Sequence, residues 1–337
     1  MKADTVFKEK ERPFEAEAII NSLLIALEAP IYPSSIKRLQ GAITAVQNEP
    51  LVIVHDRNNV FFYEGKKYLR KKSDRLYTLA KKRYNESLLA VLVLYSSRPA
   101  RNSSSYERYK RKCDAAFGRL AKCLRDYEKG NLDVARIVLS SKQYAWYVGK
   151  YRKKAIGEDV TKRLRTKLDI PIRSKSEQNI GDCLWEYAVI NHYEERFQIN
   201  VQKLVAQLEK ELRDNRQMKG KLYYYHNGAC VWNVPGELQW MNSSGSVWRT
   251  YDDRSGCITI HPDFTIMLAD GSILYWEHSG LLDDFIYRNN ASERITLMRY
   301  FNGDKDQTVI ETSELESNDK GALQHIIKTR IISRLWF

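Results

Sequence analysis

Apolar residues recur at helical spacing near the start of the chain. In residues 14–29 they stand three and four positions apart, which predicts an amphipathic helix that ends before Pro30. A second helix is predicted over 34–47. The next stretch, 51–71, has short β-rich runs separated by the polar turns DRNN and EG, and this pattern predicts a small β-meander.

Helical spacing returns between residues 74 and 129 and is interrupted by the segment SSRPARNSSS at 96–105. This pattern predicts two or more long helices that are rich in Lys, Arg and Tyr. A strongly basic segment with interleaved aromatic residues follows at 142–171. Residues 1–165 are therefore predicted to form a basic, mainly helical domain that contains the small meander and binds nucleic acid or another partner.

After Pro171 the pattern changes to alternating helices and strands, which predicts an α/β domain on a mixed sheet at 166–337 and an α+β class overall. The charged stretch at 199–215 is the least regular of these elements. The predicted elements are helices at about 175–191 and 199–215, strands within 221–232, 257–268 and 273–279, a helix at about 287–301, a strand at 307–312 and a helix near 320–330.

Two carboxylates, Asp263 and Glu277, stand among the apolar residues of the predicted strands HPDFTIML and SILYWEHSG. Alternation places Asp263 on the face opposite the larger apolar stripe of its strand. The turn ADG at 269–271 predicts a hairpin that brings Asp263 and Glu277 within cross-strand reach. Such a pair repels and one pKa rises unless a divalent cation neutralises both, so a metal is predicted here.

A third carboxylate, Glu177, begins a predicted helix in RSKSEQNIGDCLWEYA. One interpretation is a helix cap, because Ser174 and Glu177 have the S-x-x-E spacing of a capping box. The other is a metal site, because Glu177 is in register with Ile180 and Leu184 on the face that the helix must bury. A glutamate on a buried face needs a cation.

The order of a helical glutamate, P-D on a strand and a hydrophobic strand that ends in a carboxylate resembles the PD-(D/E)XK nuclease superfamily. In particular RSKSE, HPDFTI and YWEHSG look like an uncharacterised bacterial and phage branch with these motifs, and the resemblance covers about 172–310. It implies a restriction-endonuclease-like sheet flanked by helices. It also implies that Asp263 and Glu277, with Glu177, hold Mg²⁺ or Mn²⁺, which polarises the scissile phosphate and generates a hydroxide nucleophile.

The superfamily usually has a lysine two residues after the last carboxylate, where this chain has Ser279. Three interpretations stay open. Arg294 or Arg299, on the next predicted helix, supplies the missing cation. His278 acts as an acid or base, although strict alternation turns it to the other face unless the strand breaks at Ser279. Nothing replaces the lysine, and the domain binds DNA without cutting it.

The charge of the chain favours a polyanionic partner. It carries 55 Lys and Arg against 42 Asp and Glu, a formal net charge of +13. The segments 66–84 and 147–167 mix cations with aromatic rings, a composition that suits phosphate contacts and stacking on bases, while the alternative is an ordinary solvated helix face. The residues predicted to bind nucleic acid are Lys71, Lys72, Lys81, Lys82, Arg83, Arg152, Lys153 and Lys154.

The five cysteines are scattered without a C-x-x-C pair, which indicates neither a disulfide framework nor a zinc ribbon and favours the reducing cytoplasm. The apolar stretch at 19–29 is too short for a bilayer and follows acidic residues, so no export signal and no membrane anchor are expected. The oligomeric state stays open, a homo-oligomer included.

These observations together predict a Mg²⁺-dependent nuclease, an endonuclease, that hydrolyses phosphodiester bonds, with DNA favoured over RNA as its substrate. The competing hypothesis is a catalytically inactive nuclease fold that serves as a nucleic-acid-binding or interaction module. It is motivated by Ser279, and it is opposed by the retention of all three carboxylates.

Overall fold

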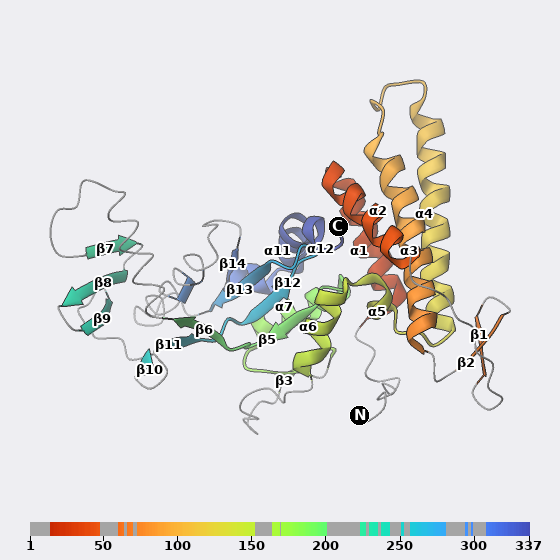
Figure 1. The fold of residues 1–337 in the computed structure, drawn as a ribbon. Helices are drawn as coiled ribbons and strands as arrows, with labels where there is room; N and C mark the ends of the chain where they lie inside the picture. The colour runs from red at the N-terminus through yellow and green to blue at the C-terminus, as the bar shows by residue number, and fades with distance from the viewer. Residues whose placement is uncertain are drawn as a thin grey trace.

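The computed structural model shows a mixed α/β protein with a mainly helical part and a four-stranded mixed sheet (Figure 1). Within the part of the chain that the structure describes, no helix is long and apolar enough to cross a membrane. The described residues are 14–47, 60–63, 66–69, 73–151, 164–168, 170–200, 223–226, 229–234, 237–242, 251–252, 257–280, 294–295, 298 and 308–337.

The helical part agrees with the predicted pattern in both the kind and the order of its elements. The predicted run at 51–55 lies outside the described residues, and the other two runs of the meander pair antiparallel as a hairpin. The elements are α1 (Ala16–Glu28), α2 (Pro33–Gln47), β1 (Val60–Tyr63), β2 (Lys66–Leu69), α3 (Ser73–Ser96), α4 (Tyr106–Lys129), α5 (Val134–Val138) and α6 (Ser141–Tyr151).

The long helices α3 and α4 pack along each other because each has a continuous apolar face. Leu88 on α3 and Leu120 and Leu124 on α4 are fully buried. Tyr127, also fully buried, donates its hydroxyl hydrogen to the carbonyl of Ala80 at 3.0 Å, which satisfies a polar group inside this interface. The segment between them, 97–105, consists of turns and bends, as its serine, proline and asparagine content predicts.

The sheet has the strand order β14-β13-β12-β5, in which β13 and β14 are parallel and the other pairs antiparallel. Helix α7 precedes β5, and the helical segments after β14 pack on α7 (Figure 1). The elements are β3 (Leu164–Arg165), β4 (Pro171–Ile172), α7 (Lys175–Glu186), β5 (Asn191–Tyr193), β12 (Phe264–Met267), β13 (Ile273–Ser279), β14 (Val309–Ser313), α10 (Glu314–Asn318), α11 (Lys320–Ile326), η3 (Ile327–Ile332) and α12 (Ser333–Leu335).

The remaining strands form two small sheets of three strands each, in the orders β10-β11-β6 and β7-β8-β9. The predicted strand region 221–232 thus contributes to two strands, β7 and β8. The elements are β6 (Phe197–Asn200), β7 (Tyr223–His226), β8 (Ala229–Val234), β9 (Glu237–Asn242), β10 (Tyr251–Asp252) and β11 (Cys257–Ile260).

Three predicted boundaries differ from the structure. The single strand predicted at 257–268 is two strands, β11 and β12, because Pro262 has no N–H to donate to a ladder and the chain changes partners there. The helix predicted at 175–191 ends at Glu186, and Ala188 has a positive φ of 53°. The helix predicted at 199–215 begins with residues of β6, and its remainder lies outside the described residues.

One cluster of buried apolar residues includes members of both predicted domains, from α1 to the segment after β14. Hydrogen bonds also join the two predicted domains in this region. The Trp336 indole N–H donates to Ser22 Oγ at 2.8 Å, and the buried Gln143 amide donates to the carbonyls of Met267 and Leu335, both at 3.3 Å. The division of the chain near residue 165 stays a prediction.

Candidate functional site

Asp263 and Glu277 face each other across the hairpin of β12 and β13. Phe264 pairs with Trp276, so the residues just outside this pair, Asp263 and Glu277, stand opposite at the open end of the ladder. The backbone N–H of His278 donates to Asp263 Oδ2 at 2.6 Å, which fixes the carboxylate against β13. The Glu277 side chain is 0% exposed, so this carboxylate depends on protein groups for its neutralisation.

A guanidinium meets Glu277 directly. Arg294 Nε donates to Glu277 Oε1 at 2.7 Å, and Arg294 Nη2 lies at the same oxygen. Within the described residues no donor reaches the other oxygen, Glu277 Oε2, which is buried. One oxygen of this carboxylate is thus bound to a cation, and the other is an orphaned acceptor inside the protein.

The electrostatics follow from this crowding of negative charge. The pKa of Asp263 lies well above its usual range because burial disfavours the charged form, and the charges of Glu277 and Glu177 add to the rise. Burial also raises the pKa of Glu277, although the Arg294 guanidinium opposes that rise. The three carboxyls therefore lie close enough to influence one another, and the site attracts positive charge.

Glu177 is positioned by the first turn of α7. Its backbone N–H donates to Ser174 Oγ at 3.2 Å, which is the helix cap that the S-x-x-E spacing predicts. The Glu177 carboxylate accepts a short hydrogen bond from the Tyr193 hydroxyl, and that hydroxyl accepts from the Arg173 backbone N–H at 3.2 Å. The helix-cap interpretation is thus confirmed, and the metal-site interpretation of Glu177, which is half-buried near Asp263, stays a prediction.

His278 lies on the opposite face of β13, as strict alternation predicts. The strand continues unbroken to Ser279, and His278 Nε2 lies 3.1 Å from Glu314 Oε2 on α10. Glu314 Oε1 also accepts from Ser176 Oγ at 2.7 Å. The imidazole is thus on the side of the sheet covered by α7 and α10, while only its backbone N–H reaches Asp263.

Tyr193, Glu314 and Ser176 were not identified from the sequence. Tyr193 lies in a strand of only three residues, and its approach to Glu177 depends on how α7 packs on the sheet. Glu314 reaches His278 only because β14 pairs in parallel with β13. A long-range pairing of this kind leaves no local signal in a sequence.

The carboxylates provide oxygen ligands of the kind that Mg²⁺ and Mn²⁺ prefer, and the orphaned Oε2 of Glu277 gives one of them an acceptor aimed at no protein donor. Among the residues that the structure describes, however, no three His, Cys, Asp or Glu side chains are arranged as a metal site. In this structure Arg294 binds Glu277 Oε1 and Tyr193 binds Glu177. A metal held by Asp263 and Glu277, with Glu177, therefore stays a prediction.

The predicted nucleic-acid contacts are less favourable than the sequence suggested. Lys81 donates to the carbonyl of Leu139, and burial lowers the pKa of its ammonium to about 8. Lys82 lies 4.0 Å from Glu86 one helical turn away, and Arg83 is half-buried on the same helix, α3. Arg299, the predicted alternative to Arg294, lies outside the described residues. So do the other predicted contacts, which are Lys71, Lys72, Arg152, Lys153 and Lys154.

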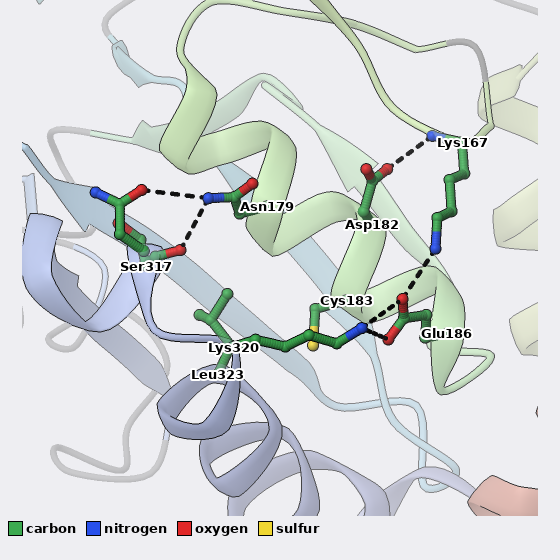
Figure 2. Close-up of a pocket in the computed structure, with 9 residues that line it drawn as sticks. Lys167, Asn179, Asp182, Cys183, Glu186, Ser317, Lys320 and Leu323 are labelled. Carbon is green, nitrogen blue, oxygen red and sulfur yellow. Dashed lines mark hydrogen bonds and ion pairs between the residues drawn. The ribbon is translucent and has the colours of Figure 1, made fainter.

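A separate cavity of about 250 Å³ lies between α7 and the segment formed by α10 and α11 (Figure 2). Its two lysines share one carboxylate, because Lys167 Nζ and Lys320 Nζ lie 2.9 and 3.0 Å from Glu186. Asn179 closes another side by donating to the Ser317 carbonyl at 3.2 Å. Neither Asp263 nor Glu277 lines this cavity.

No protein-family model, no curated protein and no solved structure matches this chain.

Proposed function

We propose that this chain is a metal-dependent nuclease that hydrolyses phosphodiester bonds in DNA through a site built on Asp263, Glu277 and Glu177. The observation that carries the proposal is the pair formed by Asp263 and Glu277 on facing strands, with one buried oxygen of Glu277 left without a donor. A fold seldom keeps a buried carboxylate beside a half-buried one unless a cation joins them, because their mutual repulsion and desolvation oppose folding.

The arrangement of the sheet supports the same proposal. A helix that begins near a glutamate precedes an antiparallel hairpin with the two carboxylates, and a parallel strand follows, in the order α7, β5, β12, β13 and β14. This order suits the restriction-endonuclease-like core that the motifs resemble, and the assignment of that fold is part of the proposal.

When bound, Mg²⁺ or Mn²⁺ supplies a Lewis acid for the scissile phosphate and lowers the pKa of a water molecule that attacks it. The other contributions come from the chain. The His278 backbone N–H orients Asp263, and Tyr193 holds Glu177 ready beside it. Arg294 is the cation that compensates for Ser279, because its guanidinium is already at the site and can donate two hydrogen bonds to a phosphate.

The second candidate function, a catalytically inactive nuclease fold that binds nucleic acid, is favoured by one specific observation. Arg294 already neutralises Glu277, and within the described residues no three potential ligands are preassembled. If this ion pair is permanent, no divalent cation is needed, and the carboxylates have a structural role.

Cleavage assays separate the two functions. Supercoiled, linear, branched and single-stranded DNA, and RNA, are incubated with Mg²⁺, Mn²⁺ or EDTA at matched salt. We expect metal-dependent cleavage of DNA that is lost in Asp263→Asn and Glu277→Gln and strongly reduced in Arg294→Ala. Glu17→Gln is the control, because Glu17 is an exposed carboxylate of α1 that pairs with Arg125. Salt-sensitive binding without cleavage of any substrate would instead establish the inactive fold.

A further inference from the structure

Helix α4 has an unusual distribution of charge. All of its side chains lie within the described residues, and its buried face is apolar, with Cys113, Ala116, Leu120, Leu124 and Tyr127 packed inward. The opposite, exposed face carries six cations within about a third of the helix circumference. We call these residues the α4 basic stripe, and they are Arg108, Arg111, Lys112, Arg119, Lys122 and Lys129.

The exposed face of α4 carries an excess of positive charge. One acidic residue, Asp126, shares the face of the stripe four positions after Lys122, and Glu107 lies on its flank four positions before Arg111. Opposite charges at i and i+4 are the ordinary way in which a solvated helix balances its charge, but these two carboxylates leave most of the six cations of the stripe without a balancing charge. The stripe is therefore a positive surface.

The stripe is also available to a partner. Among the residues that the structure describes, Arg108, Lys112, Arg119 and Lys122 have no ion-pair partner, whereas Arg125, on the flank of α4, binds Glu17. Gly118 borders the stripe, and a Cβ placed there would meet nothing within 4 Å. Figure 1 shows α4 at the outer edge of the helical part, and all six side chains of the stripe are exposed, so a large ligand can reach them.

We propose that the α4 basic stripe binds the phosphate backbone of duplex DNA. From Arg108 to Lys129 the stripe is roughly 32 Å long at ~1.5 Å per residue, close to one turn of a B-form duplex at about 34 Å. The stripe contains no aromatic side chain, because Tyr106, Tyr109 and Phe117 lie on other faces of α4. A surface of cations without rings suits backbone contacts and does not suit stacking on unpaired bases.

The stripe would hold the substrate of the proposed nuclease, and its assignment rests on that function only for the choice of nucleic acid as the partner. The stripe is a different surface from the contacts predicted on α3. Lys81 is bonded to the Leu139 carbonyl and Lys82 lies near Glu86, so the outer face of α4 offers cations that are freer to meet phosphates.

The test measures binding in EDTA, so that cleavage has no part in it. The affinity of a fluorescent duplex of about two helical turns is followed from low to moderate salt for the wild type and for the triple variant Arg108→Gln, Arg119→Gln and Lys122→Gln. We expect at least about tenfold weaker binding at ~0.1 M salt and a slope of log K against log salt that is smaller by about 2.7, at ~0.9 per lost phosphate contact. Unchanged thermal unfolding would show that the variant is folded, since all three side chains are exposed.

A charge-matched control removes three exposed cations outside the stripe, by Lys37→Gln and Arg38→Gln on α2 and Lys110→Gln on another face of α4. We expect this variant to bind like the wild type within about threefold, with an unchanged slope. Equal weakening by both triple variants would overturn the proposal, because the effect would then be one of total charge. Wild-type affinity in the stripe variant would overturn it as well.

Two further outcomes separate this proposal from others. If the wild type binds vesicles that contain phosphatidylserine but no duplex, the surface is directed at membranes and the proposal fails. If no substrate is ever cleaved but the stripe variant alone loses duplex binding, the nuclease proposal fails and the assignment of the stripe holds.

Discussion

Replacing Arg294 with alanine removes the guanidinium that binds Glu277 Oε1. Glu277 is 0% exposed and its Oε2 already has no donor among the described residues, so the variant leaves a buried carboxylate without this neutralising partner. The same substitution also removes the positive charge of Arg294 that lowers the pKa of Asp263. The change therefore tests whether the negative charge of the site is real and needs a cation.

Removing one partner of a buried ion pair costs about 3–5 kcal/mol. Arg294 is 29% exposed, so water enters part of the vacated space, and we expect the free energy of unfolding to fall by about 2–4 kcal/mol near pH 8. Loss of the guanidinium raises the Glu277 pKa further, and a protonated carboxyl is less costly to bury. The loss of stability should therefore be smaller near pH 5 than near pH 8.

Chemical denaturation monitored by tryptophan fluorescence measures this loss, in EDTA and with Mn²⁺. Arg125→Ala is the matched control, because Arg125 binds Glu17 at 2.5 Å with side chains 46% and 55% exposed, and such a surface pair contributes little to the free energy of unfolding. Mn²⁺ should stabilise Arg294→Ala more than the wild type, since the metal replaces the lost positive charge.

A double-mutant cycle with Glu277→Gln isolates the interaction. The two single variants should each be destabilised, and the double variant should recover part of the loss, with a coupling energy of about 1–3 kcal/mol. An Arg294→Ala variant as stable as the wild type at both pH values would refute the reasoning, because Glu277 could then not be a buried charge that depends on Arg294.

Four other substitutions test the charge of the site and the packing of two helices. Asp263→Asn should raise the melting temperature near pH 8 in EDTA and change it little near pH 4. The pKa of Asp263 is raised in the folded state, so the wild-type protein loses stability as the pH rises from the unfolded pKa of about 3.9 through the raised folded value, and the asparagine avoids this loss. Gly181→Ala should lower the free energy of unfolding by about 1–3 kcal/mol, since a Cβ there would lie 2.8 Å from Thr166 Cγ2. Gly118→Ala should raise it by about 0.5–1 kcal/mol in the same denaturation assay, because its Cβ would meet nothing within 4 Å. Tyr193→Phe should cost about 1–2 kcal/mol by leaving Glu177 without the phenol hydrogen bond, and a variant with wild-type stability would show that this bond contributes nothing.

Much of the fold could be predicted because its signals are local. The helical spacing of α3 and α4 and the serine-rich break between them are visible in the sequence. The opposition of Asp263 and Glu277 follows from a two-residue period on either side of the turn at 269–271, and the observed register agrees with it. Alternation also predicted that His278 would turn to the other face of the sheet.

The features that could not be predicted depend on contacts between distant parts of the chain. Lys81 is sequestered because the end of α5, which is 58 positions away, presents the Leu139 carbonyl to it. Tyr193 reaches Glu177 only after α7 has packed on β5, and the break at Pro262 matters because β11 and β12 then join different sheets. Composition marked α3 as basic, but only the fold distinguishes a bonded lysine from an exposed one.

The hydrogen bond between Trp336 and Ser22 joins residues that are 314 positions apart, and η3 and α12 pack against α1 in the same region. A ribosome adding roughly 5–20 residues per second needs roughly 15–60 s to make the intervening chain. During that interval α1 is outside the ribosome with part of its apolar face uncovered. The apolar face of α1 is therefore completed only after a segment 314 positions later has been made, and until then its uncovered part is exposed to aggregation and to chaperone binding.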